Sequence, residues 1–157
     1  MSKPALHSAA PDFTAPVVGG EFKSGDTVTL SKLKGSPVVL YFYPRDDTPG
    51  CTKQACGIRD SWAALKKSAQ IFGISPDSAK SHEKFIRKHE LPFPLIADED
   101  KTIAQAYGVW MEKSMHGRKY MGVERSTFVI DAKGKIAAVF EKVKPEEHAE
   151  QVLGALK

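Results

Sequence analysis

The feature that most constrains the fold is an uninterrupted run of β-branched and aromatic residues, Val38–Tyr43, which Pro44 ends. A strand with one face in solvent alternates apolar with polar residues, whereas a strand covered on both faces is apolar throughout. The run therefore predicts a strand in the middle of a sheet that has helices on both sides. A second apolar run, Ile71–Ser75, predicts a neighbouring strand of the same kind.

Helical and strand patterns alternate along the rest of the chain. The apolar residues Ala55, Ile58, Trp62 and Leu65 recur at spacings of three and four, and predict a helix over about 50–68. Further helices are predicted after Ser78, over 102–107 and from Pro145, and further strands at 95–98, 126–131 and 135–141. This order predicts an α/β fold with a mixed central sheet flanked by helices, and one domain over residues 1–157.

Three segments are predicted to be less regular. Residues 1–10 are polar and contain proline, and we expect a flexible arm there. The stretch 13–20 is broken by Pro16 and a Gly-Gly pair, which favours an edge hairpin or a loop. Residues 111–121 are polar and contain glycine, and predict a loop or an irregular strand.

The composition excludes several classes of function. The net charge is +4, but the positive residues are scattered and form no basic face with interleaved aromatic residues, so a nucleic-acid partner is not expected. No apolar stretch approaches the length of a membrane span, and the N-terminus has no secretory signal pattern. We therefore expect a cytoplasmic protein without a membrane partner, in which reducing pools keep thiols reduced.

Both cysteines, Cys51 and Cys56, lie where the strand 38–43 ends and the helix 50–68 begins. A thiol reacts as its thiolate, of which only about 3% is present at pH 7 for an ordinary cysteine. The first turn of a helix favours the anion by on the order of 1 kcal/mol, which is too little by itself. A nearby guanidinium would add more. The sequence therefore predicts redox chemistry at this junction, assisted by an arginine from elsewhere in the chain.

The spacing Pro44-x-x-x-Thr48-x-x-Cys51 resembles the active-site pattern of the peroxiredoxins. The second cysteine, five residues on, resembles the branch that contains the bacterioferritin comigratory protein, or peroxiredoxin Q. Three other stretches support the resemblance: Phe13-Thr14-Ala15-Pro16, Gly73-Ile74-Ser75-Pro76-Asp77 and Arg125-Ser126-Thr127-Phe128-Val129-Ile130-Asp131. It implies a thioredoxin-like fold and a thiol peroxidase that reduces hydrogen peroxide and organic hydroperoxides.

The resemblance also implies roles for individual residues. Cys51 would be the peroxidatic thiolate that attacks a peroxide oxygen, and Thr48 would place its hydroxyl beside it. Arg125 would stabilise the thiolate and the charge on the leaving oxygen. Pro44 would wall the pocket from water and so shield the sulfenic acid from premature over-oxidation.

Two more positions are expected to bind substrate with Thr48, Cys51 and Arg125. Gly50 precedes the reactive cysteine, and Gln54 matches a position that often holds a polar partner of the arginine. No metal, flavin or haem is implied, because the thiol does the chemistry.

Cys56 matches the resolving thiol, which would form an intramolecular disulfide with Cys51 that thioredoxin or a similar dithiol reduces. Five residues along a helix advance about 7.5 Å and turn about 140°, so the two Cα atoms would lie roughly 8.6 Å apart. A disulfide needs about 7 Å or less. We therefore expect the helix to unwind from Gly50 to about Arg59 after Cys51 is oxidised. Since no second chain is needed for this bond, we expect a monomer.

Other interpretations remain open. A thioredoxin-like disulfide oxidoreductase would have the same fold, although such proteins normally carry Cys-x-x-Cys. A non-enzymatic binding or chaperone-like module is a second alternative, and Cys56 could simply pack against the core. The five histidines are dispersed on polar stretches and are expected at the surface, so no compact zinc site is predicted: His7, His82, His89, His116 and His148.

Overall fold

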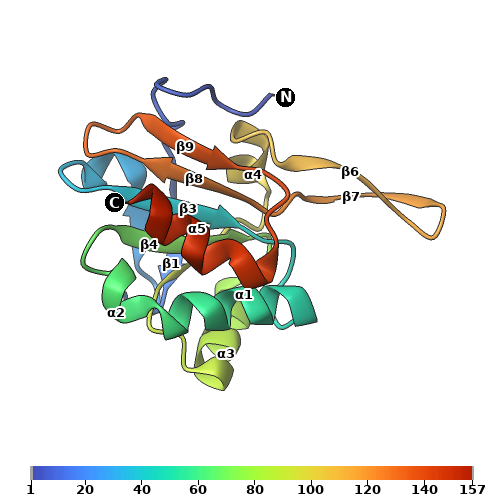
Figure 1. Cartoon of the computed structure of the whole chain (residues 1–157). Helices are drawn as coiled ribbons and strands as arrows, with labels where there is room; N and C mark the ends of the chain where they lie inside the picture. Colours follow the sequence, from blue (N-terminus) through green and yellow to red (C-terminus); the bar gives the residue numbers. More distant parts are fainter. Residues whose placement is uncertain (1, 157) are drawn as a thin grey trace.

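The structure is a computed structural model that describes residues 2–156. A seven-stranded mixed sheet forms its centre, in the order β2-β1-β5-β4-β3-β8-β9, and β6 and β7 pair separately (Figure 1). The strands are β1 Thr14–Val18, β2 Thr27–Thr29, β3 Val38–Phe42, β4 Gln70–Ser75, β5 Leu95–Ala97, β6 Trp110–Met115, β7 Arg118–Val123, β8 Ser126–Ile130 and β9 Ile136–Phe140. The helices are α1 Pro49–Asp60, α2 Trp62–Leu65, α3 Ala79–His89, α4 Thr102–Ala106 and α5 His148–Ala155, with 3-10 turns η1 Leu30–Leu33 and η2 Pro145–Glu147.

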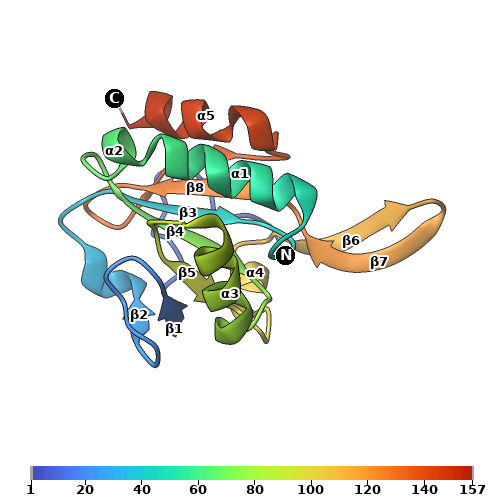
Figure 2. The same ribbon diagram turned by 90° about the horizontal axis from the view of Figure 1, so that it is seen from below.

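The apolar run that predicts the buried strand forms β3, and all its residues are buried. β3 pairs in parallel with β4 and antiparallel with β8. Its alternate residues enter two separate apolar cores. Val39 and Tyr41 pack with residues of α1, α2, α3 and α5, whereas Leu40 and Phe42 pack with residues of α4 and η1. Figure 2 shows α1 and α5 side by side over the strands β3 and β8.

The parallel strands place three loops at one edge of the sheet. β3, β4 and β5 run in the same direction, and they are followed by α1, α3 and α4 respectively. Loops at the carboxyl ends of parallel strands gather at one edge, where α/β proteins commonly bind ligands. The loop from Pro44 to Cys51 lies there. The predicted α/β class and the mixed sheet flanked by helices are confirmed.

Tight packing beneath this edge requires a glycine in β4. A Cβ atom at Gly73 would lie 2.7 Å from a Leu95 methyl group and 2.8 Å from the Tyr41 ring. Real Cβ atoms do not approach heavy atoms so closely. The small residue therefore lets β4 sit against the Tyr41 ring, which lies under α1 in the core that includes Cys51.

The predicted helix over 50–68 is interrupted. α1 ends at Asp60, where Ser61 has φ −101° and ψ 7° and begins the short helix α2. The apolar spacing continues across this break, since Ile58 and Leu65 are both buried in one core. Side-chain periodicity therefore could not show the kink.

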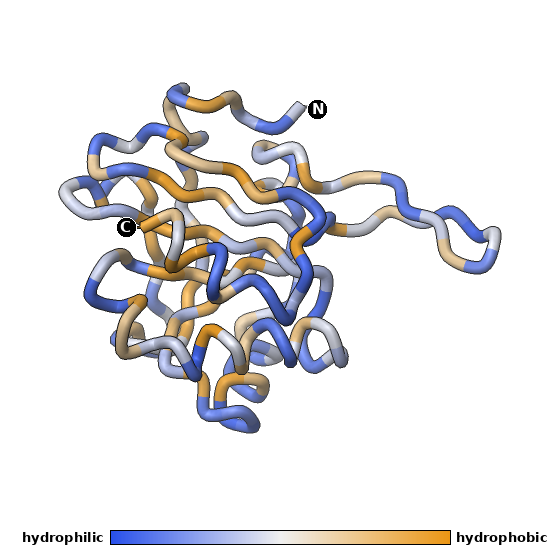
Figure 3. Tube along the Cα trace, in the orientation of Figure 1, coloured by the Kyte–Doolittle hydropathy of each residue, from blue (hydrophilic) through white to orange (hydrophobic). Residues whose placement is uncertain are grey.

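The prediction of a loop or an irregular strand over 111–121 is wrong. β6 and β7 form a regular antiparallel hairpin, with Trp110 opposite Val123 and Met115 opposite Arg118. The turn residues His116 and Gly117 have φ values of 52° and 79°, as a tight hairpin turn requires. The hairpin projects from the body and its tip is hydrophilic (Figures 1 and 3). Because solvent covers much of both faces, its strands lack the usual apolar alternation.

The N-terminal segment predicted as an arm is described from Ser2 onward, and it lies along β9. The His7 amide donates to the Ile136 carbonyl at 2.8 Å, and the Ala10 amide donates to Gly134 at 2.9 Å. Lys3 Nζ forms an ion pair with Glu124 at 3.0 Å. Within the described part of the chain, no helix has the length and apolar character to cross a membrane.

Candidate active site

The reactive cysteine predicted from the sequence lies in the first turn of α1. Thr48 is the N-cap with an extended backbone, Pro49 is the first helical residue and Cys51 is the third. The Thr52 amide donates to the Thr48 carbonyl at 2.8 Å. The amides of Gly50 and Cys51 precede that bond, at the positive end of the helix dipole. The backbone at this position therefore favours an anion.

Cys51 is only 2% exposed and belongs to the apolar core beneath α1. Its neighbours in that core include Tyr41 of β3 and Tyr43, which follows β3 directly, and the two rings stack at 5.5 Å. Burial of the thiol among aromatic side chains leaves few polar partners for a thiolate. The stabilising charge must therefore come from the helix terminus and from a nearby cation.

Arg125 places a cation at the start of α1. It precedes β8, and its guanidinium lies over the start of α1: a Cβ atom built on Gly50 would be 3.1 Å from Arg125 Nη2 and 3.8 Å from its Cζ. Glycine at position 50 therefore leaves space for the guanidinium next to the residue that precedes Cys51. Arg125 and Gly50, which are more than seventy positions apart in the sequence, thus lie close together at the first turn of α1, which also holds Cys51.

Gln54 fixes the guanidinium from one turn further along α1. Its side chain is fully buried, and Arg125 Nη1 donates to Gln54 Oε1 at 2.5 Å. This is the polar partner of the arginine expected at this position.

Behind Gln54 lies a buried histidine that the sequence analysis places wrongly. Gln54 Nε2 donates to His148 Nδ1 at 3.1 Å, and His148 Nε2 lies 2.7 Å from Thr127 Oγ1. Burial, and then the nearby Arg125 charge, lower the pKa of His148 to about 3, so the ring is neutral at pH 7. The expectation that all five histidines lie at the surface is wrong for His148 and for His82, which are both fully buried.

The buried His82 belongs to a cluster that holds the loop before α1. Asp46 in this loop accepts from Tyr43 Oη at 2.6 Å and lies 2.7 Å from His82 Nδ1. The Asp46 amide in turn donates to Asp77 at 2.7 Å. The loop is thus tied both to β3 and to α3, and these residues were not predicted from the sequence.

The same cluster brings potential metal ligands together. One ligand atom from each of Asp46, Asp77 and His82 lies within 4.8 Å of the other two. All three side chains already take part in hydrogen bonds, and His82 Nε2 lies 2.9 Å from the Ile96 carbonyl. The arrangement is accounted for by fixation of the loop.

Thr48 and Pro44 lie in the same loop. Both residues are half-buried. Thr48 Oγ1 donates to the Arg45 carbonyl at 3.0 Å, so in this structure its hydroxyl serves the turn that leads into α1. Pro44 follows β3 directly and begins the loop.

Cys56 lies in the same unbroken helix as Cys51, is half-buried and is a free thiol. The five-residue separation along a continuous α-helix gives a Cα distance of roughly 8.6 Å. The two sulfur atoms therefore cannot bond while α1 keeps this conformation.

Two further groups lie in the electrostatic field of the site. The pKa of Lys113 in β6 is lowered, because burial disfavours its ammonium and the Arg125 charge repels it, while the Cys51 thiolate acts in the opposite direction. Burial raises the pKa of Tyr41 well above its usual value, and the Cys51 charge adds to this. Lys113, in the middle of β6, therefore lies within the electrostatic reach of Cys51 and Arg125, which was not predicted from the sequence.

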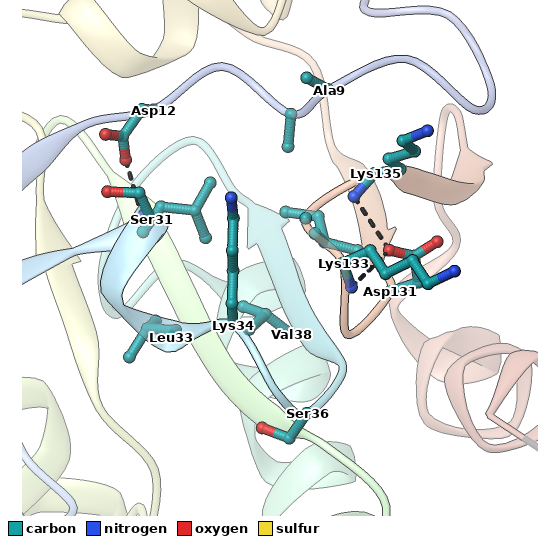
Figure 4. Close-up of a pocket in the computed structure, with 14 residues that line it drawn as sticks. Ala9, Asp12, Ser31, Leu33, Lys34, Ser36, Val38, Asp131, Lys133 and Lys135 are labelled. Atoms are coloured by element: carbon teal, nitrogen blue, oxygen red, sulfur yellow. Dashed lines mark hydrogen bonds between the residues drawn. The ribbon is translucent and has the colours of Figure 1, made fainter.

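The cavity in Figure 4, of about 370 Å³, lies away from the thiol. It is lined by Val38, where β3 begins, and by residues of the β8–β9 turn such as Asp131 and Lys133. Cys51 follows the opposite end of β3. In the view of Figure 4, the Lys34 side chain extends between those of Ser31 and Asp131. This cavity is therefore not part of the site at Cys51.

Comparisons with known proteins agree with this geometry. The AhpC/TSA family model matches residues 6–139. A putative peroxiredoxin bcp from Coxiella burnetii is 51% identical over 148 residues, which are 94% of this chain and 95% of the relative.

Two solved structures share the fold. A PrxQ mutant from Xylella fastidiosa is 32% identical, with a TM-score of 0.89 over 99% of this chain and 97% of that one. The bacterioferritin comigratory protein of Xanthomonas campestris, solved in a study of its alkyl peroxide reduction activity, is 37% identical, with a TM-score of 0.83 over 92% and 89%. The chain therefore belongs to the AhpC/TSA family and is a thiol peroxidase of its Bcp, or peroxiredoxin Q, group.

Proposed function

We propose that Cys51 is the nucleophile of this peroxidase and that Arg125 stabilises both its thiolate and the leaving oxygen. The observation that carries this proposal is the approach of the Arg125 guanidinium to Gly50, at the N-terminus of the helix whose first turn holds Cys51. In the reaction the sulfur bonds to one peroxide oxygen and the O–O bond breaks. The other oxygen leaves with the bonding electron pair and takes up a proton, and Cys51 becomes a sulfenic acid.

The substrates we propose are hydrogen peroxide and organic hydroperoxides. The similar bacterioferritin comigratory protein of Xanthomonas campestris is described as having alkyl peroxide reduction activity, which supports the second class. Gly50 and Thr48 would border the bound peroxide at the helix start, and Pro44 would limit access of water. Gln54 would keep the guanidinium in place through its hydrogen bond.

Cys56 is proposed as the resolving thiol. After α1 unwinds from about Gly50 to Arg59, the Cys56 thiolate attacks the sulfenic sulfur, and hydroxide leaves and is protonated to water. A dithiol such as thioredoxin then reduces the disulfide by two exchange steps. Because both sulfurs belong to one helix, we propose that one chain completes the cycle as a single-domain monomer in the cytoplasm, without a metal or an organic cofactor.

One experiment tests these assignments together. The wild type, Cys51→Ser and Cys56→Ser are each treated with one equivalent of hydrogen peroxide and analysed by mass spectrometry. We expect an intramolecular disulfide in the wild type, a sulfenic acid in Cys56→Ser and neither product in Cys51→Ser. A disulfide or sulfenic acid formed without Cys51 would remove it from its role.

A second assay separates this activity from that of a disulfide oxidoreductase. Peroxide consumption with a thioredoxin system is compared with reduction of insulin disulfides by the same protein. We expect the first activity to depend on Cys51 and the second to be negligible. Rapid insulin reduction together with negligible peroxide consumption would favour the oxidoreductase instead.

A further inference from the structure

A continuous hydrogen-bonded chain runs behind the thiol site from Arg125 through Gln54 and His148 to Thr127. Its proton positions follow from the groups involved. A guanidinium only donates, so the oxygen of the Gln54 amide faces Arg125 and its nitrogen donates to His148 Nδ1. Since Nδ1 is then an acceptor in a neutral ring, His148 Nε2 carries the proton and donates to Thr127 Oγ1.

These hydrogen bonds join three elements of the fold. Gln54 belongs to α1, His148 is the first residue of α5, and Thr127 lies in β8 two residues after Arg125. The imidazole is fully buried, and its ring centroid lies 5.3 Å from that of Tyr41. His148 is therefore held rigidly and can fix the orientation of the Gln54 amide.

Because of its position in the helix, Gln54 connects these hydrogen bonds to the step in which the Cys51–Cys56 disulfide forms. Gln54 lies between Cys51 and Cys56, inside the segment that must unwind before the disulfide can form. Unwinding would withdraw Gln54 from both Arg125 and His148. A buried polar group that loses its partner is unfavourable, so these hydrogen bonds oppose the unwinding.

We propose that His148 is a positioning residue that, through Gln54, both orients Arg125 for the peroxide step and holds α1 in its folded form. This inference rests on the proposed function, in which Cys51 reacts in the folded helix and Cys56 reacts in the unwound one. Loss of the His148–Gln54 hydrogen bond then has opposite effects on the two steps. The peroxide step slows because Arg125 is less well fixed, and disulfide formation accelerates because the helix opens more readily.

The test compares His148→Leu, which removes both polar atoms, with His148→Gln, whose amide can again accept from Gln54 and donate to Thr127. Sulfenic acid formation is timed in a Cys56→Ser background. Disulfide formation is timed with Cys56 present, after one equivalent of peroxide. We expect His148→Leu to slow the first step about three- to tenfold and to accelerate the second by a similar factor. His148→Gln is expected to restore both rates to within about twofold of the wild type. Glu150→Gln, at an exposed position of the same helix, serves as the control without effect.

Two results would overturn the inference: both steps slowed together, as a general loss of packing would give, or both unchanged. If His148→Leu does not fold, as judged by circular dichroism, Thr127→Val takes its place. This variant removes the acceptor of His148 Nε2 and keeps His148 and Gln54. We therefore expect it to slow sulfenic acid formation and to accelerate disulfide formation, each by a smaller factor than His148→Leu. Equal changes in both steps of Thr127→Val would again overturn the inference. A wild type that forms no sulfenic acid would show a different failure, that of the proposed function itself.

Discussion

At the residue scale, the position of the Arg125 guanidinium depends on the absence of a side chain at position 50. Arg125 reaches the start of α1 because Gly50 leaves room for its guanidinium, with Nη2 only 3.1 Å from where a Cβ atom would stand. A methyl group there must move the guanidinium by a few tenths of an ångström. The charge that we propose to stabilise the thiolate and the leaving oxygen would move with it.

We therefore predict that Gly50→Ala slows the reaction with peroxide about tenfold, while the free energy of unfolding changes by less than about 1 kcal/mol. Stopped-flow fluorescence with hydrogen peroxide, together with urea unfolding, measures both quantities. Gly57→Ala is the matched control, because a Cβ atom at Gly57 meets no described residue within 4 Å. An unchanged peroxide rate in Gly50→Ala would show that the close approach of Arg125 is not needed.

The sequence predicts the candidate reactive residues better than it predicts the buried residues that hold them in position. Motif and resemblance pointed to Cys51 and Arg125, and the structure places the Arg125 guanidinium against Gly50, which precedes Cys51. His148 was missed because a histidine in a polar stretch was assumed to be exposed. Helical phase contradicts that assumption: His148 stands four residues before the buried Val152, and His82 stands three before the buried Phe85. Both histidines thus lie on the apolar face of their helix.

At the element scale, α1 has two requirements that conflict. Its folded first turn places Cys51 at the helix N-terminus, whereas the proposed resolving step requires an unwound form in which Cys56 can reach the sulfenic acid. The rate of disulfide formation is therefore expected to follow the stability of the segment 50–59. Gly57 lies within this segment and weakens the helix, since glycine is less favourable than alanine by about 0.5–1 kcal/mol.

Gly57→Ala should accordingly slow disulfide formation by about two- to fivefold without changing the peroxide step. Rapid chemical quenching after one equivalent of peroxide, followed by alkylation and mass spectrometry, gives the rate. The peroxide step measured in the same protein is the internal control. Disulfide formation at the wild-type rate or faster would mean that unwinding of α1 does not limit resolution.

The sequence does not predict the hairpin of β6 and β7, because most of its side chains lie outside the hydrophobic core. β6 and β7 are held by each other and by their turn, and their side chains alternate between two faces that are both largely solvated. Hydrophobic periodicity reports burial, so it gave no signal for this hairpin. The sequence contains no signal for the break at Ser61 for the opposite reason. The apolar residues of α1 and α2 pack into the same core, so the hydrophobic spacing continues across the break.

At the scale of the whole molecule, the buried strand β3 determines the architecture, and the sequence predicts it well. A fully apolar strand that is followed by a helix is best buried in the middle of a sheet whose two faces are both covered. His148 also affects the stability of the whole protein. The folded-state pKa of His148, about 3, lies below the ordinary 6.5 because of burial and the Arg125 charge. Between these two values the unfolded chain binds a proton that the folded protein does not, so stability falls as the pH falls.

We predict that the free energy of unfolding of the wild type decreases by about 2 kcal/mol from pH 7 to pH 5 through this residue. His148→Gln lacks the titrating ring and should lose less over the same interval. Urea unfolding of both proteins at the two pH values makes the comparison. Equal losses in the two proteins would show that His148 does not titrate on unfolding.

The proposed cycle requires α1 to unwind before the disulfide forms, and hydrogen exchange measured by mass spectrometry reports this unwinding directly. Amides of residues 50–59 are compared between the reduced protein and the protein with the Cys51–Cys56 disulfide, with the peptide that covers α3 as the internal reference. We predict that segment 50–59 loses most of its protection in the disulfide form while α3 keeps its own. Full protection of 50–59 in protein shown to contain the disulfide would contradict the account.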